Sequence, residues 1–361
     1  VIMLISNKIK VLIVDDSAIV RKILSAELAK DPAIEVLGTA PDPFIARNKI
    51  MQLNPDVITL DIEMPKMDGL TFLKRLMTYY PIPVIMVSSV TTKDSLATIK
   101  ALEIGAFDVI NKPSGSISVK EVIDDIVHKI RKAYQVRDKF VKSHSNVKSE
   151  LDKQRKPTFA PDLLAKIKTT DQLIALGAST GGTVAIEFLF KQLPANIPPI
   201  VLVQHMPPGF TYQFSQRLNE LAAFHVKEAE DNEIIVDGHV YIAPGDKHLI
   251  VKRKGASLYT KIMDGPRIHF QKPAVDVLFE SVSKEVGTNA LGILLTGMGK
   301  DGAAGLLKMK NTGAFTLAQD EASSVVWGMP RTAIEMGAAT KVISLRDIPA
   351  FIINYYAKRG K

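Results

Sequence analysis

Short apolar runs alternate with amphipathic stretches over the first third of the chain. The apolar runs have the length of buried strands, and the stretches between them carry apolar residues at helical spacing. Five alternations of this kind predict a doubly wound (βα)5 parallel sheet with right-handed crossovers. The predicted strands are Lys10–Asp15, Glu35–Ala40, Asp56–Leu60, Val84–Val87 and Phe107–Ile110, and the last predicted helix is Val119–Ala133.

The alternation of apolar strands and amphipathic helices resumes near residue 173, where it is interrupted by an insertion with another pattern. Val236–Ile242 and His248–Ile262 alternate between apolar and polar residues and are punctuated by glycine turns, which predicts an antiparallel insertion. We therefore expect a second, mostly parallel α/β domain with an antiparallel β-hairpin insert. Its predicted parallel strands are Leu173–Leu176, Ile200–Val203, Ala290–Leu295, Ala314–Leu317 and Thr340–Ile343.

A segment rich in Lys and Arg lies between these two regions. Residues 129–168 hold 12 of the 46 Lys and Arg but only 4 of the 38 Asp and Glu, so the rest carries 34 of each sign. The basic segment is polar and interrupted by Pro157 and Pro161, which is typical of a solvated linker rather than a nucleic-acid arm. We expect a first domain at 8–134, a basic flexible linker at 135–168 and a second domain at 169–358.

Composition narrows the function classes. The chain has no cysteine, which excludes disulfides, a thiolate nucleophile and cysteine metal sites. No stretch has the length and apolarity of a membrane span, and the apolar opening Val1–Ile5 is too short for a signal peptide. We expect a cytoplasmic protein with no membrane insertion and no nucleic-acid partner.

Charged residues cluster at the predicted strand ends of the first domain. Asp15 and Asp16 end the first strand, Asp61 ends the third, Ser88 follows the fourth and Lys112 follows the fifth. The carboxyl ends of parallel strands share one edge of the sheet, where ligands bind. Three carboxylates gathered there would repel one another unless a cation joined them, and Mg²⁺ prefers such oxygen ligands. This pattern predicts a magnesium site.

These motifs resemble the receiver domain of two-component response regulators over about Lys10–Ala133. The resemblance rests on Val-Asp15-Asp16-Ser, Leu-Asp61-Ile-Glu-Met-Pro-Lys-Met-Asp-Gly, Val-Ser88-Ser and Asn-Lys112-Pro. It implies that Asp61 accepts a phosphoryl group from a histidine kinase. It also implies that Asp16, Asp61 and the Glu63 backbone carbonyl hold Mg²⁺ with Asp15 behind them, and that Ser88 and Lys112 bind phosphoryl oxygens. Val109 stands where many receivers have an aromatic switch residue, so a rotating-ring relay is not expected.

Three residues of the second domain suggest nucleophilic catalysis. Ser179, His205 and Asp301 each lie just beyond a predicted parallel strand, so they should meet at one sheet edge. A serine hydroxyl needs a base to become a nucleophile, and a histidine needs a carboxylate to orient it. Of the seven histidines, only His205 directly follows a buried parallel strand. The pattern predicts a Ser-His-Asp triad in an order unlike that of α/β-hydrolases.

Two other interpretations compete with the triad. Ser179, in Gly177-Ala-Ser-Thr-Gly181, could act only as a helix N-cap. Gly297-Met-Gly-Lys-Asp-Gly302 has the spacing of a dinucleotide-binding fingerprint, with Asp320 suitably downstream. That motif falls late in its domain, however, and Asp301 would repel a pyrophosphate, so the nucleotide interpretation is the weaker one.

The second half resembles the catalytic domain of the chemotaxis protein-glutamate methylesterase over about Leu173–Tyr355. The motifs are Gly-Ala-Ser179-Thr-Gly-Gly, Gln-His205-Met-Pro-Pro-Gly-Phe-Thr, Pro-Ala-Val-Asp-Val-Leu-Phe279, Leu-Thr-Gly-Met-Gly-Lys-Asp301-Gly and Trp-Gly-Met-Pro330. The resemblance implies hydrolysis of glutamate methyl esters, and deamidation of glutamines, on chemoreceptor cytoplasmic domains. It assigns the nucleophile, base and orienting acid to Ser179, His205 and Asp301, and the oxyanion donor to the Met298 backbone. It implies no metal for this step.

Two alternatives remain beside a phosphorylation-regulated esterase. A response regulator whose output domain only docks on a partner would keep the Asp61 chemistry but would need no triad. A DNA-binding regulator is disfavoured by the neutral charge outside the linker and by the lack of a helix-turn-helix signal.

Overall fold

The computed structural model describes residues 8–88, 92–112, 119–138, 140–141 and 172–359. The chain divides into two compact units, Val1–Gln154 and Arg155–Lys361. From residue 142 to 168, the predicted basic linker lies outside the described residues. The start of that predicted linker is packed on the first unit, because the buried Phe140 ring lies 5.8 Å from the Phe107 ring.

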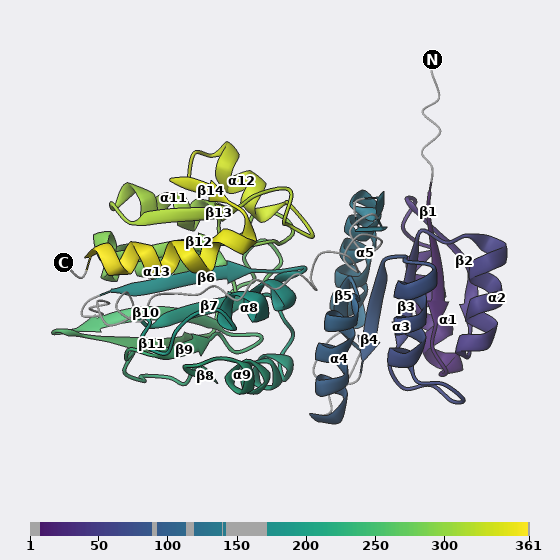
Figure 1. Cartoon of the computed structure of the whole chain (residues 1–361). Coiled ribbons are helices and arrows are strands. Elements are labelled where there is room, and N and C mark those ends of the chain that lie inside the picture. The colour runs from purple at the N-terminus through teal and green to yellow at the C-terminus, as the bar shows by residue number, and fades with distance from the viewer. Residues whose placement is uncertain (1–7, 89–91, 113–118, 139, 142–171, 360–361) are drawn as a thin grey trace, which may run out of the picture. The chain divides into compact units, whose positions relative to one another are not determined.

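The first unit is a five-stranded parallel sheet with the strand order β2-β1-β3-β4-β5 (Figure 1). Its strands are β1 (Ile9–Val14), β2 (Ile34–Ala40), β3 (Val57–Asp61), β4 (Val84–Ser88) and β5 (Asp108–Asn111). Its helices are α1 (Ala18–Leu28), α2 (Pro43–Leu53), α3 (Gly69–Tyr79), α4 (Thr92–Ile104) and α5 (Val119–Gln135). The predicted doubly wound (βα)5 fold is confirmed.

Local chemistry explains where these helices begin. Ser17, Asp42 and Asp68 have extended backbones, and each side chain accepts a hydrogen bond from a backbone N–H of the following first turn, so each is a helix N-cap. The central strands β3 and β4 are wholly buried, as expected for a parallel sheet covered by helices on both faces. Helix α1 packs beside α5, and α3 beside α4.

The second unit has a seven-stranded sheet with the order β14-β13-β12-β6-β7-β9-β8, and all its strands are parallel. The strands are β6 (Leu173–Ala178), β7 (Ile200–Gln204), β8 (His225–Glu228), β9 (His239–Ile242), β12 (Ala290–Leu294), β13 (Phe315–Gln319) and β14 (Lys341–Ile343). From β6 the chain proceeds to β7 on one side and later returns to β12 on the other. In such a sheet, the reversal of direction marks a ligand-binding crevice at the carboxyl ends of the strands.

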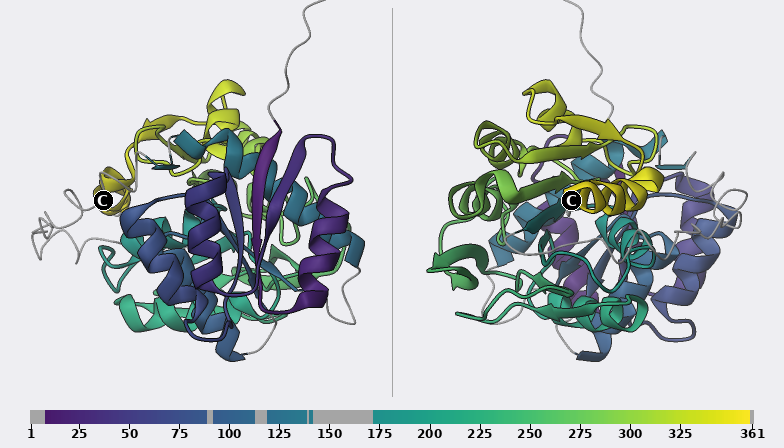
Figure 2. Two further views of the ribbon diagram at one scale, coloured as in Figure 1. Left: turned by 90° about the vertical axis from the view of Figure 1, so that its right-hand side faces the viewer. Right: turned by 60° about the vertical axis from the view of Figure 1, so that its left-hand side comes forward.

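Helices cover this sheet (Figure 2). Helix α8 contacts α9, and α10, α11 and α12 pack in succession. The α-helices are α8 (Gly182–Phe190), α9 (Phe210–Leu221), α10 (Val275–Glu285), α11 (Ala303–Asn311), α12 (Met329–Glu335) and α13 (Ile348–Arg359), with short 3₁₀ turns η1 (Gly287–Asn289) and η2 (Leu345–Asp347). Within the described residues, no helix has both the length and the apolar character needed to cross a membrane.

The antiparallel insert is smaller than the sequence pattern predicts. It consists of β10 (His248–Lys254) and β11 (Ser257–Met263), which pair over seven residues each. The assignment of Val236–Ile242 to this insert is wrong, because β9 lies in the main sheet between β7 and β8 and runs parallel to both. Val240, Tyr241 and Ile242 are all buried. A strand covered on both faces does not require the alternation that distinguishes a half-exposed strand.

Candidate active site

Ser179, His205 and Asp301 belong to the loops that follow three adjacent strands. Ser179 follows β6, His205 follows β7 and Asp301 lies in the loop after β12. Since β6 lies between β7 and β12, the carboxyl ends of these strands bring the three loops to one edge of the sheet. Backbone hydrogen bonds join them there: Ser179 N–H donates to the Thr296 carbonyl at 3.1 Å, and His205 N–H donates to the Ala178 carbonyl at 3.1 Å.

Ser179 is held on a turn that packs closely against Gly297. A Cβ added at Gly297 would lie 2.9 Å from the Ser179 Cβ and 3.0 Å from its nitrogen. Gly181, the N-cap of α8, has a φ of 78°, a left-handed value that glycine adopts without strain. Gln204 Nε2 donates to the Ser179 carbonyl at 3.0 Å and stabilises the turn from β7. Gln204 had no assigned role in the sequence analysis, and only the β6–β7 pairing identifies one.

His205 and Asp301 form a buried pair. Nε2 of His205 lies 2.7 Å from Oδ2 of Asp301, and the two side chains are only 4% and 2% exposed. The other ring nitrogen, Nδ1, is also buried and has no hydrogen-bond partner among the described residues. We assign the Nε2–H tautomer, in which Nε2 donates to the carboxylate and Nδ1 has a free lone pair. A ring held in this way has one nitrogen available as a base.

The Asp301 carboxylate also accepts two backbone hydrogen bonds from the start of α10. Val275 N–H donates to Oδ2 at 2.7 Å, and Asp276 N–H donates to Oδ1 at 2.9 Å. Burial by itself would raise the pKa of Asp301, but the His205 hydrogen bond and charge and the two N–H donors lower it below the ordinary value. His205 and, to a smaller extent, the helix N-terminus therefore keep Asp301 ionised.

Asp276 is a second carboxylate at this site, and the sequence analysis assigned it no role. Its Oδ1 accepts a hydrogen bond from Gly305 N–H at 2.7 Å, in the first turn of α11. Its Oδ2 lies 3.3 Å from Nε2 of His269. Burial, together with the neighbouring negative charge of Asp301, raises the pKa of Asp276. Its place in the first turn of a helix that follows Pro273 was the available sequence signal, but only the fold brings that turn to Asp301.

The backbone of Met298 lies close to the serine. Met298 follows Gly297, which is in contact with Ser179, and its N–H donates no hydrogen bond to the described residues. The carbonyl of Gly297 accepts hydrogen bonds from Gly328 N–H at 3.0 Å and Met329 N–H at 2.9 Å, which holds the loop in place. An N–H that is fixed beside a serine and has no acceptor can stabilise an oxyanion.

Gly297, the first of the fingerprint-like glycines, thus lies against Ser179. Asp320, the residue that would contact a ribose in the dinucleotide interpretation, accepts hydrogen bonds from the backbone and hydroxyl of Ser323 at 3.0 and 2.5 Å. The structure therefore provides a local structural role for Asp320 and does not favour the nucleotide interpretation.

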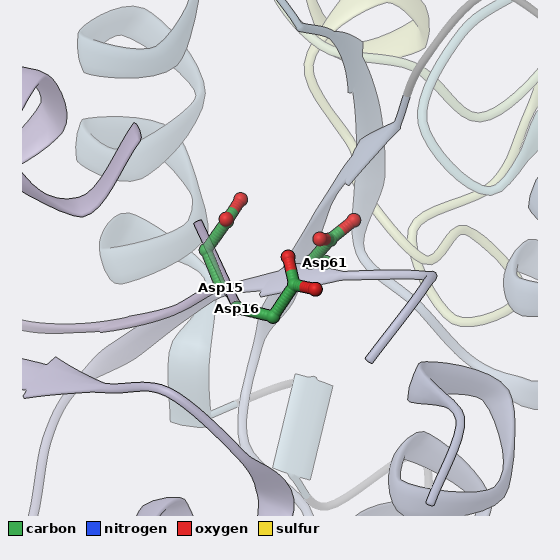
Figure 3. A group of neighbouring side chains, drawn as sticks. All are labelled: Asp15, Asp16 and Asp61. Carbon is green, nitrogen blue, oxygen red and sulfur yellow. The ribbon is translucent and has the colours of Figure 1, made fainter. Parts of the chain in front are cut away.

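The first unit gathers three carboxylates at the carboxyl ends of β1 and β3 (Figure 3). Asp15, Asp16 and Asp61 each offer a carboxylate oxygen, and these atoms lie within 4.8 Å of one another. Asp15 and Asp61 are buried, whereas Asp16 is exposed. Asp16 and Glu63 line a depression of about 410 Å³ that opens beside this group. Oxygen atoms at this spacing suit a small divalent cation such as Mg²⁺.

Lys112 reaches the same carboxylates from the end of β5. Its Nζ lies 2.7 Å from Oδ2 of Asp61 and 3.1 Å from Oδ2 of Asp15. Burial and the charge of Asp15 raise the pKa of Asp61 to about 6, against the opposing influence of Lys112. Burial would lower the pKa of Lys112, but its bonds to the two aspartates raise it. One ammonium therefore offsets part of the repulsion between the two buried carboxylates.

The remaining predicted receiver residues lie around this group. Ser88 is buried at the end of β4, and the Lys112 N–H donates to its carbonyl at 2.7 Å. Glu63 N–H lies 3.4 Å from Oδ1 of Asp61. Val109 is buried in β5. It is the aliphatic residue because of which no rotating aromatic ring is expected at this position.

Comparison with known proteins agrees with this arrangement. Residues 174–352 match the family model of the CheB methylesterase, and residues 11–124 match that of the response regulator receiver domain. The protein-glutamate methylesterase/protein-glutamine glutaminase 2 of Syntrophus aciditrophicus is 51% identical over 347 residues, covering 96% of this chain and 99% of the relative. The corresponding protein of Salmonella typhimurium is 48% identical, covering 95% of each chain.

A solved structure extends the similarity to three dimensions. The crystal structure of the Thermotoga maritima CheB methylesterase catalytic domain is 39% identical, with a TM-score of 0.50, and the match covers 51% of this chain and 98% of that domain. The identity to full-length relatives, over nearly the whole of both chains, shows the family directly. The chain belongs to the protein-glutamate methylesterase/protein-glutamine glutaminase family, with a response-regulator receiver domain followed by a CheB methylesterase domain.

Proposed function

We propose that the protein hydrolyses methyl esters of glutamyl side chains, and deamidates glutamines, on the cytoplasmic domains of chemoreceptors. Its relatives carry the names of these two activities. The observation that carries the proposal is the buried His205–Asp301 pair, 2.7 Å apart, on the strand-end loops next to Ser179. An output domain that only docked on a partner would not need a buried imidazole that is oriented by a carboxylate and has one nitrogen free.

The proposed reaction proceeds in two steps. Nδ1 of His205 takes the proton of Ser179 Oγ, and the oxygen attacks the ester carbonyl while the Met298 N–H binds the developing oxyanion. The C–O bond to methanol then breaks, and His205 returns its proton to the leaving oxygen. Water attacks the acyl-enzyme with the same base, which restores Ser179 and releases the glutamate carboxylate. For a glutamine side chain, ammonia replaces methanol as the leaving group.

In the first unit, we propose that Asp61 accepts the phosphoryl group from a histidine kinase. Asp16, Asp61 and the Glu63 backbone carbonyl would hold Mg²⁺, with Asp15 behind them, and the close grouping of acidic oxygens supports this assignment. When bound, Mg²⁺ supplies positive charge for phosphoryl oxygens. Lys112, already 2.7 Å from Asp61, would pair with those oxygens, and the Ser88 hydroxyl would donate to them. The esterase step requires no metal, because it uses only the serine, histidine and backbone donors.

Methanol release from methylated receptor membranes tests the esterase. Ser179→Ala and His205→Gln should each lower turnover by several orders of magnitude, since triad members act as a unit. Ser257→Ala, on β11 of the hairpin insert, is the matched control and should behave like wild type. If Ser179→Ala kept more than about a tenth of wild-type turnover, the proposed mechanism would be wrong.

A further inference from the structure

Gln204, the last residue of β7, places a buried amide between the proposed nucleophile and the proposed base. The residue is only 3% exposed. Its Nε2 donates to the Ser179 carbonyl at 3.0 Å and to the His205 carbonyl at 3.1 Å. A side-chain amide has two N–H hydrogens, so one nitrogen can bind both carbonyls. One side chain therefore joins the backbone of the serine to the backbone of the histidine.

Two backbone hydrogen bonds hold the same peptide groups. His205 N–H donates to the Ala178 carbonyl at 3.1 Å, and Gly182 N–H donates to the Ser179 carbonyl at 2.7 Å. The first of these continues the parallel ladder between β6 and β7, which forms whatever the side chains are. The bonds from Gln204 depend instead on one side chain. Ser179 and His205 are thus connected by the ladder on one side and by the amide on the other.

Stability alone does not explain the glutamine. Oε1 of Gln204 is buried and has no hydrogen-bond partner among the described residues. A Cβ added at Gly182 would lie 2.2 Å from this oxygen, so the glycine leaves the space that the amide fills. A buried acceptor without a partner lowers stability, and an apolar side chain of the same length would avoid that cost. The two N–H groups are therefore the feature that sets glutamine apart at this position.

The geometry that this amide restrains matters to the proposed reaction. Proton transfer from Ser179 Oγ to His205 Nδ1 requires the two atoms to come within hydrogen-bond distance when substrate is bound. A misplacement of about 1 Å can cost a hundredfold in rate. The histidine ring is already held by Asp301 at 2.7 Å, so the position of the serine turn relative to the histidine is what remains to be fixed.

We propose that Gln204 is a positioning residue for the serine and the histidine, an inference that rests on the function proposed above. Its amide fixes the Ser179 turn against the His205 backbone, so that Oγ and Nδ1 meet when substrate binds. Gln204 acts through two backbone carbonyls and not through contact with the ester. Loss of the donor therefore slows the chemical step and leaves affinity for the receptor unchanged.

The test removes the donor from the full-length chain. Gln204→Met keeps the length of the side chain, and Gln204→Glu keeps its shape but has no N–H group. On methylated receptor membranes, we expect kcat of Gln204→Met to fall about ten- to a hundredfold with KM within twofold of wild type, and kcat of Gln204→Glu to fall further. The rate at which a small fluorophosphonate labels Ser179 should fall by the same factors.

Gln192→Met is the matched control. It makes the same substitution at a glutamine just beyond the end of α8, whose Nε2 also donates to a backbone carbonyl, that of Phe188, at 3.0 Å. Since this amide holds neither Ser179 nor His205, the variant should retain wild-type rates in both reactions.

The final extent of labelling separates positioning from loss of the fold. Every folded chain is eventually labelled, so Gln204→Met should reach the wild-type extent slowly. A lower extent at an unchanged rate would mean that Gln204 only supports the fold, and would overturn the positioning role. Wild-type rates in both reactions, or a higher KM with unchanged kcat, would overturn it as well. A wild-type chain that is labelled at Ser179 but releases no methanol would refute the proposed substrate, and the labelling rates would still decide the role of Gln204.

Discussion

Asp276 donates a backbone hydrogen bond to the Asp301 carboxylate, and together the two residues join the starts of two helices. The Asp276 N–H, in the first turn of α10, donates to Asp301 at 2.9 Å, and the Asp276 carboxylate accepts from Gly305 N–H, in the first turn of α11, at 2.7 Å. Asp301 lies just before α11, so each helix start is bound by an aspartate from the other segment. The pair therefore fixes where the proposed orienting carboxylate lies.

We expect Asp276→Ala to lower kcat on receptor esters by about ten- to a hundredfold, because Asp301 would lose its fixed position. Asp276→Asn retains an oxygen that can accept from Gly305, and should recover most of this loss. Glu280→Ala, which removes an exposed carboxylate of the same helix that pairs with Lys284 and Lys308, is the control. Steady-state kinetics at several pH values provide the measurement. An equal loss for the Asn and Ala variants would show that the charge, and not the hydrogen bond, is what matters.

The orientation of the His205 ring leads to a spectroscopic prediction. With Nε2 donating to Asp301 and Nδ1 unpaired, the neutral ring should be the Nε2–H tautomer. Nitrogen-15 NMR of histidine-labelled protein at pH 8 should show a protonated Nε2 and an unprotonated Nδ1 for two buried histidines, His205 and His248, since His248 Nε2 lies 3.0 Å from the Pro266 carbonyl and its Nδ1 accepts from Ala274 N–H at 3.2 Å. His205→Gln should remove one of the two signals and so assign it, and Asp301→Ala should shift the same signal towards a mixture of tautomers. A protonated Nδ1 at His205 in the wild-type protein would contradict the proposed assignment of the base.

The raised pKa of Asp61 predicts that this carboxyl lowers the free energy of unfolding at neutral pH more than at acidic pH. A carboxyl with a folded pKa of about 6 binds more protons in the folded chain than in the unfolded chain between about pH 4 and 6, so its contribution to stability falls as pH rises through that window. Asp61→Asn removes the charge and should stabilise the first unit by about 1 to 3 kcal/mol at pH 7. The gain should shrink towards pH 4.

Calorimetric unfolding of the full-length chain at pH 4.5 and 7 checks this prediction. Asp16→Asn is the control, since Asp16 is exposed and its charge is better solvated than that of Asp61. If Asp61→Asn stabilised the protein equally at both pH values, the buried charge would not be the source of the cost.

We also expect the receiver to regulate the esterase. Phosphorylation of Asp61 adds close to two negative charges beside Lys112 and Ser88, which should rearrange the surrounding loops and lift an inhibitory effect of the receiver. Tenfold activation requires only about 1.4 kcal/mol of differential stabilisation, so an effect of this size is the safer expectation. A small phosphodonor with Mg²⁺ should stimulate the full-length chain but not Asp61→Ala. A truncated chain starting at Pro157 should be active without the phosphodonor.

Methanol release by the three proteins, measured side by side, decides the outcome. Equally low activity in the unphosphorylated full-length chain and the truncated chain would eliminate inhibition by the receiver and leave direct activation as the only form of control.

Local patterns in the sequence were enough to predict most elements of both sheets. Buried parallel strands are uninterrupted apolar runs, and helices repeat apolar residues at their own period, so both are recognisable without tertiary information. The same reasoning failed for Val236–Ile242, where a short buried strand and one edge of a hairpin look alike. Only the pairing of β9 with β7 and β8 resolved its place.

For the candidate triad, the sequence indicates which residues to consider, and the order of the strands decides whether they lie together. The residues Ser179, His205 and Asp301 were predictable because each follows a recognisable strand. That β6 lies between β7 and β12 depends on sheet order, which residues far apart in sequence decide through packing. The roles of Asp276 and Gln204 come from the same source: their partners are 25 residues away in the chain, and only the folded sheet brings their polar atoms within hydrogen-bond distance.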